Sequence, residues 1–175
     1  TGKSTGGKLI AKKFHLAFLS SGLLYRYASY LIIKHGPKDK ISFLKKKFNK
    51  LNYNSLKKIN LHTPEISSTS ASIAKELRIR NILKKYQKNF ITNNKGCVLE
   101  GRDASTKILP NSDVKFFFIC NINTAAKRRF NELKKNSKKI NLNEIKRALY
   151  ERNLMDRSRK FSPLQKHPDA VVVNT

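Results

Sequence analysis

The sequence has few acidic side chains, few cysteines and no long apolar segment. It contains 11 Asp and Glu against 38 Lys and Arg, which gives a formal net charge of +27 at pH 7. Its two cysteines, Cys97 and Cys120, are too few for a disulfide framework and lie in apolar runs, so we expect reduced thiols in a cytoplasmic protein. No apolar run approaches the roughly 20 residues of a membrane span, so we expect no membrane partner. The histidines share no spacing typical of zinc ligands and stand at His15, His35, His62 and His167.

The excess of positive charge favours a ligand that carries phosphate. Lysine and arginine neutralise phosphates and release counterions, so a nucleic-acid partner is one interpretation. The lysines are, however, spread along the whole chain among many Asn and Ile, which is typical of solvated helix faces in a protein of biased composition. The charge alone does not choose the size of the ligand, and a basic RNA-associated module stays open as an alternative.

Apolar periodicity predicts helices that alternate with short strands. Strands are predicted at 16–19, 97–99, 114–120 and 170–173, and the two that hold the cysteines are expected to be buried. Helical spacing is found in 5–14, 23–35, 41–48, 64–90, 124–135 and 142–160. Gly36-Pro37 is predicted to stop a helix and Pro64 to begin one. This alternation indicates an α/β protein, in which helices cover both faces of a parallel sheet.

The segment Gly2-Lys3-Ser4, placed directly before a helix, matches the second half of a phosphate-binding loop. In such a loop the backbone N–H groups at a helix N-terminus bind phosphate oxygens, and we expect residues 2–5 (Gly2, Lys3, Ser4 and Thr5) to supply them. Lys3 would reach the β- and γ-phosphates of ATP, and the Ser4 hydroxyl would bind Mg²⁺. The first glycine of the pattern would lie upstream of Thr1, so the motif by itself also fits an ordinary helix cap.

Three further segments occur in an order and at separations that resemble the bacterial cytidylate kinases. Residues 20–26 (SSGLLYR) are similar to the family pattern D-[ST]-G-x-x-Y-R. Residues 100–110 (EGRDASTKILP) are similar to G-R-D-x-G-T-x-x-x-P, and residues 152–164 (RNLMDRSRKFSPL) are similar to the lid pattern R-D-x-x-D-x-x-R-x-x-x-P-L. Together with the phosphate-loop motif, the resemblance extends over nearly the whole chain.

The resemblance implies Mg·ATP-dependent phosphorylation of CMP, and of dCMP, by a monomer with no specific nucleic-acid partner. It also implies a three-layer P-loop kinase fold with a parallel sheet in the order 2-3-1-4-5. The chain begins after strand 1 of that order, so we expect it to be truncated at both ends, poorly folded and inactive by itself. The core domain would comprise 1–37 and 91–151 with 165–175, the nucleoside monophosphate-binding region 38–90, and the lid 152–164.

Side chains of the first two segments, and Arg80 between them, are expected to bind the acceptor nucleotide. The guanidinium groups of Arg26, Arg80 and Arg102 can hold a monophosphate bidentately, although each could also form a surface salt bridge. By resemblance, Asp103 contacts the nucleoside, or it orients Arg102. Glu100, again by resemblance, lies near the phosphates and helps to hold the water shell of the metal ion.

The lid segment is expected to serve both the acceptor and the transfer step. The resemblance assigns Arg152 and Asp156 to the acceptor nucleotide and Arg157 and Arg159, with Lys3, to the transferring phosphoryl group, whose charge must be neutralised. The same spacing on a helix also fits an exposed face of i,i+3 and i,i+4 salt bridges.

Two serines are expected to recognise the sugar or base. They are Ser21 and Ser72, with Ser70 as the alternative to Ser72 and helix capping as the ordinary role of such serines. The chain departs from the family at Ser20 (usually Asp), Ser105 (usually Gly) and Asn153 (usually Asp). The segment 38–72 is shorter than in bacterial relatives, which leaves UMP or AMP open as the acceptor.

Overall fold

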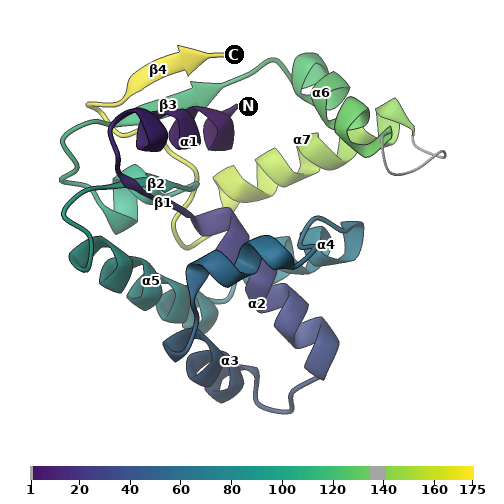
Figure 1. The fold of residues 1–175 in the computed structure, drawn as a ribbon. Coiled ribbons are helices and arrows are strands. Elements are labelled where there is room, and N and C mark those ends of the chain that lie inside the picture. The colour runs from purple at the N-terminus through teal and green to yellow at the C-terminus, as the bar shows by residue number, and fades with distance from the viewer. Residues whose placement is uncertain (1, 135–140) are drawn as a thin grey trace.

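The computed structural model describes residues 2–134 and 141–175. The elements, in chain order, are α1 (Lys3–Lys13), β1 (Ala17–Ser20), α2 (Ser21–His35), α3 (Lys40–Asn49), the 3₁₀ helix η1 (Tyr53–Lys58), α4 (Pro64–Ile73), α5 (Leu77–Thr92), β2 (Cys97–Glu100), the π-helical turn η2 (Ala104–Ile108), β3 (Phe116–Ile119), α6 (Ile122–Lys134), α7 (Leu142–Ser158) and β4 (Val171–Asn174). Figure 1 shows the strands with α1, α6 and α7 in one half of the molecule and α2 to α5 in the other.

The strands form two parallel pairs. β1 pairs with β2 so that Ser20 lies opposite Glu100, and β3 pairs with β4 so that Ile119 lies opposite Asn174. The predicted α/β class with parallel strands is therefore confirmed. These pairs match neighbours in the order 2-3-1-4-5, but within the described residues neither pair is hydrogen-bonded to the other. The full strand order stays a prediction.

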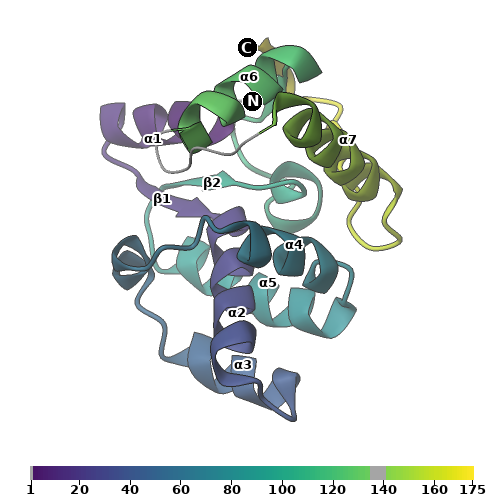
Figure 2. The ribbon, with the colours of Figure 1, turned by 90° about the vertical axis from the view of Figure 1, so that its right-hand side faces the viewer.

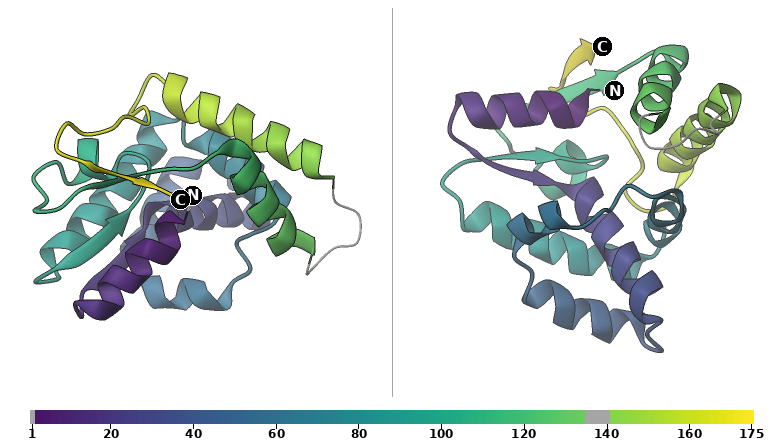
Figure 3. Two further views of the ribbon diagram at one scale, coloured as in Figure 1. Left: turned by 90° about the horizontal axis from the view of Figure 1, so that it is seen from above. Right: turned by 45° about the vertical axis from the view of Figure 1, so that its right-hand side comes forward.

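Helix α1 packs against both pairs of strands. A Cβ atom added at Gly6 would lie 3.0 Å from the Phe118 ring of β3, and one added at Gly7 would lie 2.9 Å from the Phe18 ring of β1. Only glycine lets the helix backbone approach both strands this closely. Figure 3 shows α1 running beside the strands in two further views.

The helices α2 to α5 enclose the main hydrophobic core. α2 packs against α4, and α3 packs against α5, as Figure 2 shows from the side. The residues of this core with the least exposure are Leu19, Leu24, Ala28, Leu44, Leu56, Leu61, Ile79 and Leu83. The predicted helix signals are confirmed here, because Gly36 ends α2 in the left-handed conformation and Pro64 stands in the first turn of α4.

Two local features join the elements of this half. α2 follows β1 directly, because Ser20 is also the N-cap of α2 and its Oγ accepts a hydrogen bond from the Leu23 N–H. The connector before His62 contains η1, which Asn52 caps and the buried Leu56 anchors.

The strand predicted at 114–120 is shorter and more exposed than expected. β3 covers four residues, of which Phe116 is 44% exposed and Ile119 is 40% exposed. Both cysteines are also half-exposed rather than buried. Within the described residues β3 pairs on one side only and α1 covers part of one face, which leaves these side chains uncovered.

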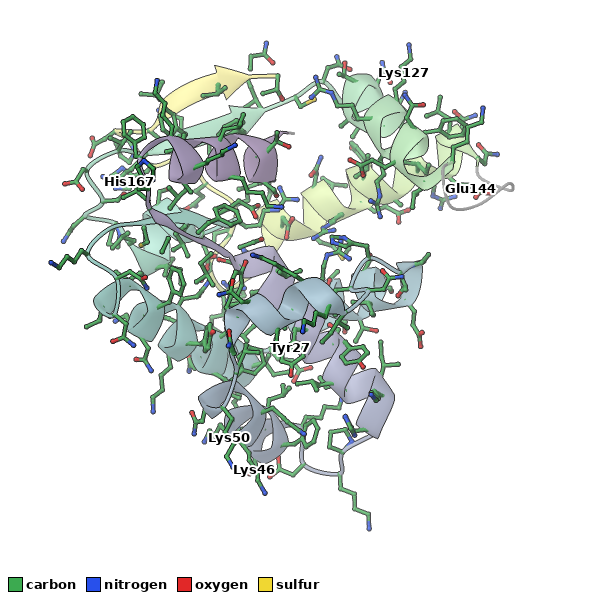
Figure 4. All side chains as sticks on the ribbon, in the orientation of Figure 1. Tyr27, Lys46, Lys50, Lys127, Glu144 and His167 are labelled. Carbon is green, nitrogen blue, oxygen red and sulfur yellow. The ribbon has the colours of Figure 1, made fainter. Side chains whose placement is uncertain are left out.

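Helices α6 and α7 pack against each other. α7 ends at Ser158, two residues before the predicted end, because Arg159 has extended backbone; the last residue of the helix predicted at 124–135 lies outside the described residues. Lys46 and Lys50 near α3 and Lys127 on α6 are exposed and point away from the body, as solvated lysines do (Figure 4). Every helix in the described residues is too short or too polar to span a bilayer.

Candidate active site

The N-terminus of α1 meets the carboxyl ends of the strands. Gly2 caps α1, and a Cβ atom added there would lie 3.7 Å from Thr175, directly after β4; the two chain ends lie side by side in Figures 1 and 3. Lys3 Nζ lies 3.9 Å from Oε1 of Glu100 at the end of β2. Ligands of parallel α/β sheets bind at such strand ends, and the N–H groups that begin a helix bind anions.

Lys3 is a partly buried cation among other positive charges. Its pKa is lowered from the usual 10.5 to about 8, first by burial and then by the charges of Arg102 and Arg152, while Glu100 and Asp156 oppose the change. An anionic ligand would offset both the burial and the repulsion. The protein thus holds Lys3 in a state that favours phosphate.

Four arginines from different elements crowd the same region. The pKa of Arg26 in α2 is lowered to about 10, first by burial and then by repulsion from Arg152 in α7 and Arg129 in α6. Burial also lowers the pKa of Arg152, and the neighbouring Arg102 adds repulsion. Positively charged groups brought together without an equal number of carboxylates are typical of a site for a multiply charged anion.

Asp156 joins two of the predicted arginines. Its Oδ2 lies 3.0 Å from Nε of Arg102, and its Oδ1 accepts a hydrogen bond from Nη1 of Arg159 at 3.3 Å. The Arg159 side chain is 7% exposed and also donates from Nε to the Ser162 carbonyl at 2.6 Å. Within the described residues its buried Nη2 has no hydrogen-bond partner. Since buried donors are normally satisfied, this nitrogen is available to a ligand.

Arg80 and Asp103 form a buried ion pair beside Tyr25. Their side chains are 7% and 6% exposed, and Arg80 also donates from Nη1 to the Ala74 carbonyl at 3.1 Å. The guanidinium carbon lies 5.7 Å from the centroid of the Tyr25 ring. A cavity of about 460 Å³ borders this pair between α5, η2 and the segment 160–165.

Ser21 fixes the loop after β2 against the start of α2. Its buried hydroxyl accepts a hydrogen bond from Nε2 of Gln87 in α5. A Cβ atom added at Gly101 would lie 2.8 Å from Ser21 Oγ, so a glycine is required there. The backbone of Gly101 therefore packs closely on Ser21, directly before Arg102 and Asp103 in the chain.

The same sequence pattern occurs in known proteins over the whole length of the chain. The family model described as cytidylate kinase matches residues 1–175. The chain belongs to the cytidylate kinase family. The cytidylate kinase of Bartonella tribocorum is 35% identical over 180 residues, which cover all of this chain and 82% of that protein. That of Fervidobacterium nodosum is 32% identical over 185 residues, covering all of this chain and 84% of that protein.

A cytidylate kinase can also be one part of a larger protein. The bifunctional pantoate ligase/cytidylate kinase of Prochlorococcus marinus is 34% identical over 196 residues, covering all of this chain but 38% of that protein. Membership of the cytidylate kinase family makes this protein an enzyme, a nucleotide-binding transferase of the kinase class. The family predicted from the three motif segments is confirmed.

In this member of the cytidylate kinase family, the structure brings most of the predicted site residues together and leaves a few apart. The connected residues are Lys3, Ser21, Arg26, Arg80, Arg102, Asp103, Arg152, Asp156 and Arg159. Ser4, Thr5 and Arg157 are exposed, and within the described residues Arg157 forms no ion pair. Ser72 is exposed on α4, whereas Ser70 is buried and donates to the Ser67 carbonyl at 2.8 Å.

Arg26 is held by the segment that is expected to bind the monophosphate. Its Nη1 donates to the Leu61 carbonyl at 3.0 Å and to Ser67 Oγ at 2.7 Å. A phosphate that accepts hydrogen bonds from Arg26 would therefore compete with two contacts to the 38–90 segment.

Two residues at this cytidylate kinase site were missed by the motif analysis. The charge of Arg129, which lies in α6, lowers the pKa of Arg26 and of Arg152. Arg129 also pairs with Glu132 at 2.9 Å. Tyr53 reaches the strand ends from η1. Neither belongs to a motif, and only the arrangement of distant segments in space reveals them.

Proposed function

We propose that the protein transfers the γ-phosphoryl group of ATP to CMP, and to dCMP, giving ADP and the cytidine diphosphate. The observation that carries this proposal is the convergence of Arg102 and Arg152 on Lys3 at the start of α1, with Arg26 beside Arg152. Two nucleotides bring several phosphate charges together, and such a cluster neutralises them. The names of the relatives support CMP as the acceptor.

On the donor side, residues 2–5 (Gly2, Lys3, Ser4 and Thr5) would hold ATP. Their backbone N–H groups begin α1 and favour phosphate oxygens. Lys3 would contact the β- and γ-phosphates. Within the described residues no group of three or more His, Cys, Asp or Glu could form a metal site. Oxygen donors such as the Ser4 hydroxyl and Glu100 fit a Mg²⁺ ion that arrives with ATP and keeps most of its waters. When bound, the ion neutralises phosphate charge.

On the acceptor side, the monophosphate would lie between α2, the loop after β2 and α7. Arg26 and Arg102 supply two guanidinium forks there, and Arg152 and Asp156 would bind the sugar end of the acceptor. The buried Arg80–Asp103 pair, with Ser21 and Ser72, would contact the nucleoside. The pair is already formed, so it presents its remaining polar atoms to the base in a fixed orientation.

For the transfer step, positive charge must surround the moving phosphoryl group. We assign this role to Lys3, Arg157 and Arg159, with 152–164 acting as a lid that excludes water. The buried Nη2 of Arg159 supports the assignment, since it lacks a partner within the described residues. We assign 38–90 to the acceptor-binding region of the chain. The core domain would comprise 1–37, 91–151 and 165–175.

We further propose that the enzyme acts as a cytoplasmic monomer without a specific nucleic-acid partner. The free thiols of Cys97 and Cys120 suit a reducing compartment. The exposed lysines of α3 and α6 lie on outward helix faces, which supports a solvating role.

The donor site is tested by removing Lys3 and comparing a lysine on the same helix. In a coupled assay with ATP, Mg²⁺ and CMP, Lys3→Ala is expected to lower kcat by about a hundredfold or more, because a charge-stabilising group is lost. The matched control Lys8→Ala, at an exposed position of α1, should change kcat by less than about twofold. Equal rates for the two variants would contradict the proposed donor site.

A further inference from the structure

The hydroxyl group of Tyr53, a residue outside the motif segments, reaches the end of β1. Tyr53 begins η1, and its Oη accepts a hydrogen bond from the backbone N–H of Ser20 at 2.8 Å. The Tyr53 ring packs against Phe90 of α5, with 6.2 Å between the ring centroids. The side chain is therefore anchored in the 38–90 segment while its polar end lies at the end of β1.

The side chain of Ser20 in turn binds Glu100. The Ser20 hydroxyl donates to Oε2 of Glu100 at 2.5 Å, and the other carboxylate oxygen, Oε1, lies 3.9 Å from Nζ of Lys3. The hydroxyl also accepts from the Leu23 N–H at 3.4 Å, so its one donor is directed at Glu100 and its oxygen is held by α2. A serine adds no carboxylate here, so the negative charge at the end of the β1–β2 pair resides on Glu100.

We propose that Tyr53 is a positioning residue for Glu100 and acts on it through Ser20. The inference rests on the proposed function, in which Glu100 lies against the phosphates and the water shell of the metal ion. Tyr53 fixes the backbone of Ser20 at the junction of β1 and α2, and the side chain of the same residue fixes one oxygen of Glu100. Without the phenolic oxygen, the Ser20 N–H loses its acceptor and the junction can shift. Partners one step removed from a metal or reacting group commonly change activity by about 10–100-fold.

Tyr53→Phe is the direct test, because it removes one oxygen and keeps the ring on Phe90. The matched control is Tyr30→Phe, since Tyr30 in α2 accepts a hydrogen bond from Nζ of Lys34 at 3.1 Å and stacks on Tyr27. Tyr53→Phe is expected to lower kcat for CMP about tenfold and to raise the Mg²⁺ concentration that gives half-maximal rate, with the KM for CMP changed less than about twofold. Tyr30→Phe is expected to keep wild-type values. Equal kcat values for the two variants would overturn the proposal.

A second readout does not depend on activity. The backbone amide of Ser20 should exchange its hydrogen about tenfold faster or more in Tyr53→Phe than in Tyr30→Phe, as measured by NMR, because its acceptor is gone. Unchanged exchange at Ser20 would overturn the positioning role even where kcat falls. If the wild-type protein phosphorylates no CMP, the proposed function fails, and the exchange result still decides whether Tyr53 holds Ser20.

A double-mutant cycle locates the pathway of the effect. Ser20→Ala removes the bond to Glu100 but keeps the amide that Tyr53 binds. Adding Tyr53→Phe to Ser20→Ala should lower kcat by less than about twofold more, because both changes act through the same carboxylate. A full tenfold further loss would show that Tyr53 acts by another route and would overturn the proposal.

Discussion

Replacing Arg159 by alanine separates the transfer step from acceptor binding. Arg159 donates to Asp156 and to the Ser162 carbonyl, and its Nη2 is buried without a partner in the described residues. If Nη2 contacts the phosphoryl group only as charge develops, Arg159→Ala should lower kcat by about a hundredfold while the KM for CMP changes less than about threefold.

The same structure predicts the accompanying loss of stability. Arg159→Ala strands the Ser162 carbonyl and one oxygen of Asp156, although Arg102 still pairs with the other oxygen. A buried polar group left unsatisfied costs about 1–3 kcal/mol, so we expect a loss of about 2 kcal/mol in the free energy of unfolding. For a domain of this size that corresponds to a fall in Tm of roughly 4–8 °C.

The measurements are steady-state kinetics and calorimetry on Arg159→Ala beside Arg147→Ala. Arg147 lies in α7, the helix that Arg159 directly follows; its side chain is 83% exposed and pairs with Glu151, so its removal should leave kcat unchanged and stability within about 0.5 kcal/mol. If kcat for Arg159→Ala is unchanged and only the KM for CMP rises, the role assigned to Arg159 is wrong.

Three other predictions concern Lys3, the packing of α1 and nucleic acid. Because the pKa of Lys3 is about 8 instead of 10.5, kcat/KM for ATP should fall as the pH rises through about 8, when the free enzyme loses the charge. The free energy of unfolding should rise over the same range and up to about 10.5, since the unfolded chain holds that proton more tightly; a flat profile in both measurements would contradict this. Gly7→Ala should cost about 1–3 kcal/mol by urea unfolding, because its Cβ would lie 2.9 Å from Phe18, whereas an unchanged midpoint would refute the close packing. RNA binding should fall steeply with salt in a fluorescence titration while CMP and ATP binding persist, and RNA binding that resists salt would revive the RNA-associated module.

The sequence predicts those parts of the fold that depend on neighbouring residues. Gly36 and Pro64 mark helix ends through backbone preferences that act within one turn, and both predictions are confirmed. The two parallel strand pairs follow from the alternation of strands and helices. Exposure of β3 was predicted wrongly, because apolar content gives the tendency of Phe116 to be buried but not whether a neighbour covers it.

The candidate site could be predicted mainly where it lies on motifs. The phosphate-loop motif gives Lys3, the resemblance of the other segments to the family gives Arg102 and Asp156, and the structure joins these residues. Tyr53 and Arg129 are not found, because their contacts span long sequence separations; Tyr53 binds Ser20 across 33 residues. The pairing of Ser20 with Glu100 across 80 residues depends on the register of β1 with β2, which no local pattern fixes.

The most direct test of the central claim is a comparison of kcat/KM for CMP, dCMP, UMP and AMP with ATP and Mg²⁺ by the full-length enzyme. We predict that CMP is the best acceptor, with AMP lower by about a hundredfold or more, because in the proposed site the base would contact the buried polar pair of Arg80 and Asp103 and a mismatched base would leave polar atoms of that pair unsatisfied. AMP or UMP as the best acceptor would contradict the assigned specificity while leaving the kinase class intact, and no phosphoryl transfer to any of the four would contradict the proposed function.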